Sequence, residues 1–269
     1  IGEASIGWCG YPLDKRIFPW NHANCGDLNL SGERRPQSYL RETLWSDAPV
    51  SHIVVTPPVP SFPLNPDKAD WSVWDFPDVV DHWNFPGYEG KKMTVSVYSN
   101  CEQVELFLNG ESLGKQENTA DKKNTLVWEV PYAHGILKAV SYNKGGEVGT
   151  ATLESAGKVE KIRLSADRTE IVADGNDLSY ITLELVDSKG IRNQLAEELV
   201  EFSIEGDATI EGVGNANPMS IESFVANSRK TWRGSNLLVV RSGKSSGRII
   251  VTAKVKALPV ASITITQKK

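Results

Sequence analysis

The sequence has little cysteine or methionine and no long apolar run. Its 269 residues include 3 Cys and 2 Met, and no stretch approaches the roughly 20 consecutive apolar residues that a membrane-spanning helix needs. Lys and Arg number 29 against 34 Asp and Glu, and they are scattered along the chain. These features exclude a membrane-embedded protein. They also argue against a nucleic-acid binder, whose affinity rests on clustered cations at phosphates.

Complete motifs for nucleophilic catalysis and for cofactor binding are also missing. Two strings, Gly110 to Gly114 and Gly243 to Gly247, fit the Gly-x-Ser-x-Gly pattern, but neither is followed by an expected helix as a nucleophile elbow is. The sequence contains no phosphate-binding P-loop. The run Gly212 to Gly214 lacks the third glycine of a dinucleotide fingerprint, and we expect it to be a turn. His22 has Cys9, Cys25 and Asp27 nearby, but this spacing matches no zinc knuckle. We therefore predict neither a metal nor a cofactor.

The three cysteines cannot form a complete disulfide framework, because their number is odd. Cys9 and Cys25 share one irregular segment, whereas Cys101 lies between two expected strands. A Cys9–Cys25 bridge in an oxidising compartment and two reduced cysteines both remain open, the reduced state being the simpler interpretation.

Composition changes along the chain. Six of the 8 Trp fall within the first 83 residues and eleven of the 14 Pro within the first 86, and alternating Val, Ile, Thr and Leu dominate afterwards. The length suits two or three domains, and we place boundaries at 1–50, 51–156 and 157–269. The Pro-rich run 56–60 would be the first linker region. Because the chain begins at Ile1 without a Met, we expect it to be a piece of a longer protein.

The first segment contains one clear helix signal. Pro36 suits a first helical position, and Tyr39, Leu40 and Leu44 recur at helical spacing, which predicts a helix over 36–45. The two later segments show the period-two alternation of half-buried strands, with turn residues such as Asn109-Gly110 between them. Short strands at even spacing predict a mainly β protein with two tandem β-sandwiches.

The polar, Gly-punctuated loop before the helix carries Trp8, Tyr11, Trp20 and His22. Flat aromatic faces suit the stacking of sugar rings, which makes Trp8 and Trp20 candidate binding residues. The alternative is that these rings pack against a neighbouring domain, and this alternative is favoured for Trp45.

The order of three sequence blocks resembles glycoside hydrolase family 2, particularly β-galactosidase-like enzymes of Bacteroidetes. Ile1–Trp8, Asn24–Leu28 and Arg35–Trp45 resemble the end of the catalytic (β/α)8 barrel in that family. The second block resembles the small sandwich that follows the barrel, through Pro86–Lys91, Tyr98–Cys101 and Val104–Gly110. The third resembles the terminal immunoglobulin-like domain, through Ala173–Ser179 and Asn227–Lys230.

This resemblance implies two immunoglobulin-like β-sandwiches preceded by a loop-plus-helix remnant of the barrel. Family members are retaining glycosidases that use two glutamates, at the ends of the fourth and seventh barrel strands. Both positions would lie upstream of Ile1, and Glu3 follows the eighth strand instead. The resemblance therefore implies an active parent enzyme and an inactive fragment without catalytic residues. The loop after the eighth strand lies on the active-site face of a barrel, so Trp8, Trp20 and His22 would border the sugar subsites.

The expected function is that of the non-catalytic C-terminal portion of a secreted or periplasmic β-galactosidase-type hydrolase. Its partners would be the barrel of the same polypeptide, the carbohydrate substrate of the parent and, as an open point, a second copy in a homodimer. The alternative is a carbohydrate-binding module that tethers the parent to polysaccharide. Exposed, coplanar aromatic rings would favour the module, but Trp128 lies at an inward-facing strand position and Trp232 stands alone.

Overall fold

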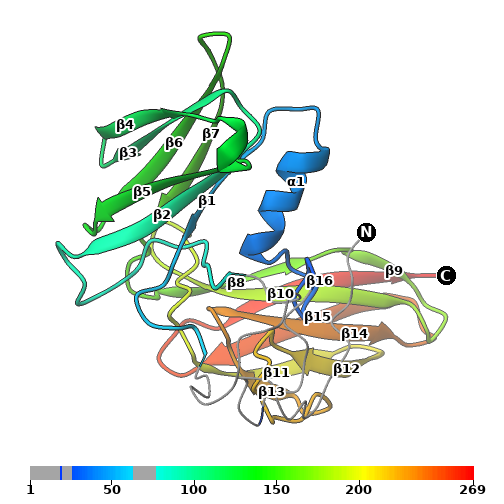
Figure 1. Ribbon diagram of the computed structural model, residues 1–269. Helices are drawn as coiled ribbons and strands as arrows, with labels where there is room; N and C mark the ends of the chain where they lie inside the picture. Colours follow the sequence, from blue (N-terminus) through cyan, green and yellow to red (C-terminus); the bar gives the residue numbers. More distant parts are fainter. Residues whose placement is uncertain (1–18, 20–25, 63–76) are drawn as a thin grey trace. The chain divides into compact units, whose positions relative to one another are not determined.

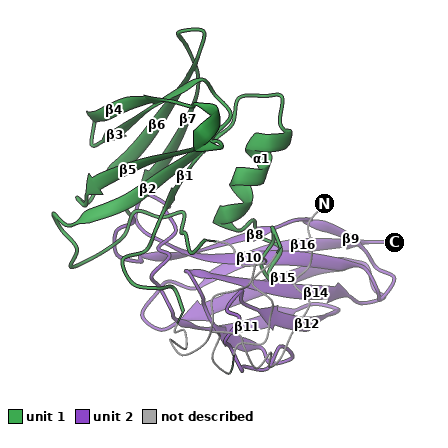
Figure 2. Cartoon of the chain, in the orientation of Figure 1, with its two compact units in different colours: residues 1–155 green, residues 156–269 purple. Residues whose placement is uncertain are grey.

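The computed structural model describes residues 19, 26–62 and 77–269 (Figure 1). The chain forms two compact units, residues 1–155 and 156–269, which are coloured separately in Figure 2. Each unit contains two sheets, built almost entirely from antiparallel strand pairs. The prediction of a mainly β protein with two tandem β-sandwiches is therefore confirmed. No helix in the described ranges is long and apolar enough to cross a bilayer.

The first unit pairs a three-stranded sheet, β1-β2-β5, with a four-stranded sheet, β4-β3-β6-β7. Its strands and short helices are β1 (Ser51–Val55), β2 (Lys92–Ser99), β3 (Gln103–Leu108), β4 (Glu111–Glu117), β5 (Thr125–Pro131), β6 (Ile136–Asn143), β7 (Gly146–Glu154), η1 (Pro36–Ser38), α1 (Tyr39–Trp45) and η2 (Ala120–Lys122). The alternating side chains of β2, β3 and β5 enclose a core that includes Val95, Leu106 and Trp128. Trp128 is 7% exposed, as its inward strand position predicts.

The predicted helix is present, with a tighter start. Residues Pro36–Ser38 form a 3₁₀ turn with Pro at its first position, and α1 continues from there to Trp45. Tyr39 and Leu40 of α1 pack against Val54, Val79 and Tyr98, a small cluster separate from the main core of this unit. The helix lies beside β1 and β2 (Figure 1), so the helical segment is part of the first unit.

The second unit pairs a four-stranded sheet, β12-β14-β10-β8, with a five-stranded sheet, β13-β11-β15-β16-β9. Its strands are β8 (Lys161–Ala166), β9 (Glu170–Val172), β10 (Leu178–Val186), β11 (Leu199–Glu205), β12 (Ala208–Gly214), β13 (Ser228–Lys230), β14 (Ser235–Ser242), β15 (Gly247–Val255) and β16 (Ala261–Lys268). Fully buried Leu183, Leu238 and Val251 lie in its core. Short β9 pairs in parallel with the last strand, β16.

One prediction for this unit is wrong. Residues Gly212 to Gly214 lie in β12, where they pair with β14, and they do not form a turn. The register between β12 and β14 shifts between Ile210 and Gly212, which marks a β-bulge. A bulge interrupts the period-two alternation that identifies a strand in sequence, and glycine is common at such positions.

Candidate functional site

The predicted subsite residues Trp8, Trp20 and His22 lie outside the described residues, as do Cys9 and Cys25. Cys101 is described, and it is buried with a free thiol. Among the described residues, the charged side chains with several defined contacts include two polar clusters and one buried arginine. One cluster lies in the first unit, and the other cluster and the arginine lie in the second.

The cluster of the first unit joins α1 to β1 through Arg34, Tyr39, Glu42 and His52. The rings of Tyr39 and His52 are stacked, with centroids 4.0 Å apart and planes 10° apart. His52 Nε2 lies 3.0 Å from Glu42 Oε2, and Arg34 donates a 2.7 Å hydrogen bond to the same oxygen. The guanidinium carbon of Arg34 lies 4.5 Å from the centroid of the Tyr39 ring. One carboxylate thus contacts both the arginine and the histidine, and one aromatic ring also contacts both.

The pKa values of this cluster follow from its geometry. Partial burial lowers the pKa of His52. The carboxylate of Glu42 raises this pKa, but burial outweighs it, and the pKa stays below its usual value. Desolvation raises the pKa of Glu42, but the hydrogen bond and charge of Arg34, together with His52, outweigh it and leave the pKa lowered. Glu42 is therefore an ionised acceptor at neutral pH. A proton-donating carboxylic acid needs the opposite shift.

Further polar contacts fasten α1 to the first sandwich. Asn124 Nδ2 donates to the hydroxyl and the carbonyl of Thr43, at 3.1 and 3.3 Å. Asn100 Nδ2 donates to the carbonyls of Ser46 and Ala48, at 3.0 and 2.8 Å. Leu44 and Trp45, by contrast, are 61% and 77% exposed. The helix therefore has one face fixed on the sandwich and two large apolar side chains exposed at its C-terminal end.

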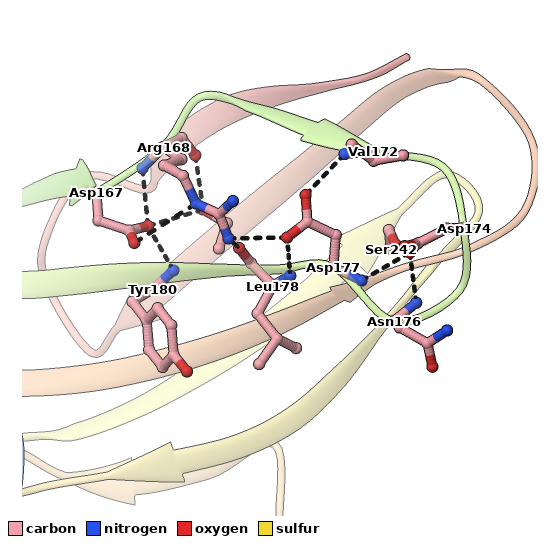
Figure 3. A network of polar contacts seen from close by, with 10 residues as sticks. Asp167, Arg168, Val172, Asp174, Asn176, Asp177, Leu178, Tyr180 and Ser242 are labelled. Carbon is pink, nitrogen blue, oxygen red and sulfur yellow. Dashed lines mark hydrogen bonds and ion pairs between the residues drawn. The ribbon is translucent and has the colours of Figure 1, made fainter. Parts of the chain in front are cut away.

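The polar cluster of the second unit surrounds the loop between β9 and β10 (Figure 3). Asp174 Oδ1 accepts hydrogen bonds from the backbone N–H groups of Asn176 and Asp177, at 2.7 and 2.8 Å. Asp177 Oδ2 accepts from Val172 N–H at 2.8 Å, and its Oδ1 accepts from Leu178 N–H and from Arg168, both at 2.9 Å. These carboxylates close the loop on itself.

Backbone N–H donors lower the pKa of Asp174 and Asp177. Asp174 Oδ1 and both oxygens of Asp177 are already engaged by protein donors, so the cluster is suited to fixing a loop. Within the described residues, no group of three or more His, Cys, Asp and Glu side chains is arranged to hold a metal ion. The segment Ala173–Ser179, which carries part of the sequence resemblance, is thus a structural loop motif.

The buried arginine is Arg229 of β13, whose side chain is 1% exposed. Its NH1 donates to the carbonyls of Val213 and Glu222, both at 3.2 Å, and its NH2 donates to Ser220 Oγ at 3.0 Å. The guanidinium carbon lies 4.1 Å from the centroid of the Phe224 ring. Arg229 therefore joins β12 to the loop that follows it.

None of these three arrangements was predicted as a site. The helical spacing of Tyr39 and Glu42 could have placed both on one face of α1. The partner His52 lies on β1, a strand that the sequence pattern did not reveal. The buried role of Arg229 has no local signal, because a single Arg in a strand is usually exposed.

Comparisons with known proteins match both units. Residues 162–264 match the family model described as glycoside hydrolase family 2 C-terminal domain 5. Residues 90–149 match a domain of unknown function, DUF4982. The chain is similar to the beta-galactosidase BoGH2A of Bacteroides ovatus, with 30% identity over 253 residues that cover 94% of this chain and 26% of that protein.

Solved structures agree with these matches. A crystal structure of a glycosyl hydrolase family 2 member from Bacteroides cellulosilyticus is 95% identical, with a TM-score of 0.86 over 91% of this chain and 32% of that one. A beta-glycosidase from Bacteroides vulgatus is 25% identical, with a TM-score of 0.78 over 93% of this chain and 29% of that one. The chain therefore spans between 26% and 32% of the length of these relatives.

Proposed function

Because the chain belongs to glycoside hydrolase family 2, we propose that it is the non-catalytic C-terminal portion of a retaining β-galactosidase-type enzyme. One observation carries this proposal: the chain aligns over 91% of its length with only 32% of a family member that is 95% identical to it. The remaining part of such a protein would hold the catalytic barrel. Both catalytic glutamates would then lie upstream of Ile1.

The proposed reaction of the parent is the hydrolysis of terminal β-galactosides or related β-glycosides. One glutamate would protonate the leaving oxygen, and the other would form a covalent glycosyl-enzyme that water then hydrolyses.

The proposed role of the chain is to support the barrel and the assembly of the enzyme. Residues 1–50 would form the end of the barrel, with Trp8, Trp20 and His22 bordering the sugar subsites. The exposed Leu44 and Trp45 at the end of α1 would pack against the rest of the barrel. Tyr39 and Leu40 of the same helix pack against the first sandwich, so α1 would join the sandwich to the barrel. We place the parent in the periplasm or outside the cell, with a homodimer as one form of assembly.

Turnover of nitrophenyl β-galactoside tests the proposal. The chain alone should give the rate of the buffer blank, and the longer protein encoded by the same reading frame should give turnover. Nitrophenyl β-glucuronide, assayed in parallel, separates the two activities named among the relatives. Turnover by the isolated chain, or a longer protein inactive on both substrates, would overturn the proposal.

A further inference from the structure

The loop between β12 and β13, residues 215–227, exposes a cluster of apolar side chains. Ile221 and Val225 are each 82% exposed, and Phe224 is 50% exposed. Isolated apolar residues on a protein surface need no explanation, but here three lie within five residues of one loop, and we refer to Ile221, Phe224 and Val225 together as the apolar patch.

The backbone of this loop is held in place at several points. Arg229 contacts Ser220, Glu222 and Phe224, as described above. Phe224 also accepts a 2.8 Å backbone hydrogen bond from Val213 N–H of β12. Asn215 Nδ2 donates to the carbonyl of Lys230 at 2.8 Å. A buried guanidinium is costly unless it is hydrogen-bonded. The loop supplies partners for NH1 and NH2 of Arg229, although its buried Nε has none, so the loop and Arg229 stabilise each other in part.

The three apolar side chains have one carboxylate among them, and its oxygens are hydrogen-bonded within the loop region. Glu222 is the only ionisable residue from 217 to 227. Its Oε1 accepts from Lys230 N–H at 3.0 Å, and its Oε2 accepts from Ser220 Oγ at 3.0 Å. A loop whose backbone is already held loses little backbone entropy on docking, and its three exposed apolar side chains suit an apolar protein surface.

We propose that Ile221, Phe224 and Val225 dock onto the part of the longer glycosidase that lies outside this chain, an inference that rests on the proposed function. Most of that protein is available for such a contact, because the chain covers 32% of the 95% identical structure. The size of the patch favours this partner over a second copy. Three side chains offer on the order of 300 Å², whereas a standard interface between separate proteins uses about 800 Å² on each side.

The small area of the patch is sufficient if its partner belongs to the same polypeptide. Covalent linkage holds the two surfaces at an effective concentration of about millimolar or higher, so that a small patch suffices to keep them together. The expected partner surface is apolar and belongs to the same protein.

Cysteine footprinting tests this contact. Ile221→Cys and Val225→Cys are made both in this chain and in the longer protein, and their rates of modification by a maleimide are compared. Val260→Cys, at a position that is 57% exposed in the same unit, is the matched control. The reaction of the unsubstituted protein is subtracted. For each position we compare the rate in the longer protein with the rate in the isolated chain. We expect this ratio to be at least tenfold lower at 221 and 225 than at 260.

Equal protection at 221 and 260 would overturn the inference. Protection in the isolated chain that increases with its concentration would also overturn it, because a second copy would then be the occupant. Trp45→Cys separates this result from the proposed function. If position 45 is protected and the longer protein gives turnover, but position 221 is not protected, the docking inference is wrong and the proposed function is retained.

A second measurement needs no cysteine. The pair Ile221→Ser and Val225→Ser should leave the urea midpoint of the isolated chain unchanged, because both side chains are exposed there. The same pair should lower the thermal midpoint of the longer protein. An unchanged midpoint in the longer protein would contradict the docking.

Discussion

The side chain of Asn109 fills the space in which a side chain at position 135 would lie. A Cβ atom built on Gly135 would overlap Asn109 Oδ1. That oxygen accepts a 2.8 Å hydrogen bond from Ile136 N–H, and Asn109 Nδ2 donates to the carbonyl of His134 at 3.2 Å. The β3–β4 turn is thereby joined to the start of β6.

Gly135→Ala should therefore destabilise the first unit. The new methyl group displaces an amide that makes two hydrogen bonds, and Gly135 also has a φ of +142°, which L residues rarely adopt. We expect a loss of about 2–4 kcal/mol in the free energy of unfolding, measured by urea titration. Gly149→Ala is the control, because no atom lies within 4 Å of its Cβ position. Equal effects at the two positions would contradict this explanation.

Acid should destabilise the contact between α1 and β1. Partial burial lowers the pKa of His52 below its usual 6.5, so the unfolded chain takes up this proton at a higher pH than the folded chain. The contribution of neutral His52 is full above about pH 6.5 and is lost as pH falls through the folded pKa. Glu42, whose lowered pKa reflects Arg34 outweighing desolvation, adds a further loss below about pH 4.5.

Two variants of this pair should change the pH dependence in opposite directions. His52→Phe keeps a ring against Tyr39 and removes the titrating group, so the decline in urea midpoint between pH 7 and pH 5 should become shallower. Glu42→Gln removes the charge that raises the pKa of His52, so the decline should become steeper. The two slopes are compared with that of the unchanged chain. Parallel slopes in all three proteins would show that another group controls the acid response.

The strands that sequence patterns revealed are those with one face in a core. Val95 and Val97 of β2 alternate with Thr94 and Ser96, and the hairpin turn at Asn109 has the positive φ that this residue tolerates. Strand β1 was missed because Ile53, Val54 and Val55 are consecutive and all buried: Val54 packs against α1 residues and its neighbours enter the main core. Strand β4 was missed because Leu113 is the only large apolar side chain among its mostly exposed residues.

The clusters were harder to predict than the strands, because each depends on long-range register. Glu42 and His52 meet only because α1 packs across β1. The buried state of Arg229 requires the β12–β13 loop to fold over its guanidinium, which no spacing within the sequence indicates. Local periodicity therefore identifies elements, whereas contacts between elements decide which polar side chains act together.

Calcium should not stabilise the loop between β9 and β10. Asp174 Oδ1 and both oxygens of Asp177 already accept hydrogen bonds from backbone N–H groups and from Arg168, and a cation that used these three oxygens would have to displace the donors. We expect the same thermal midpoint in EDTA and in millimolar calcium. A rise with calcium that disappears in Asp174→Asn would show that the loop binds the ion.

Removing the guanidinium of Arg229 should destabilise the second unit. Arg229→Met keeps part of the apolar stem but leaves the carbonyls of Val213 and Glu222 without this donor, and we expect a loss of about 2–4 kcal/mol in the free energy of unfolding. Arg229→Lys should recover little of this loss, because a single ammonium cannot reproduce the planar fork that contacts three groups and the Phe224 ring.

Arg248→Met, at an exposed position on β15, is the control for loss of charge. Urea unfolding measures all three variants, and cleavage of the 215–227 loop by a protease should accelerate only in the two Arg229 variants. Full recovery by lysine would mean that charge, rather than hydrogen-bond geometry, holds the loop.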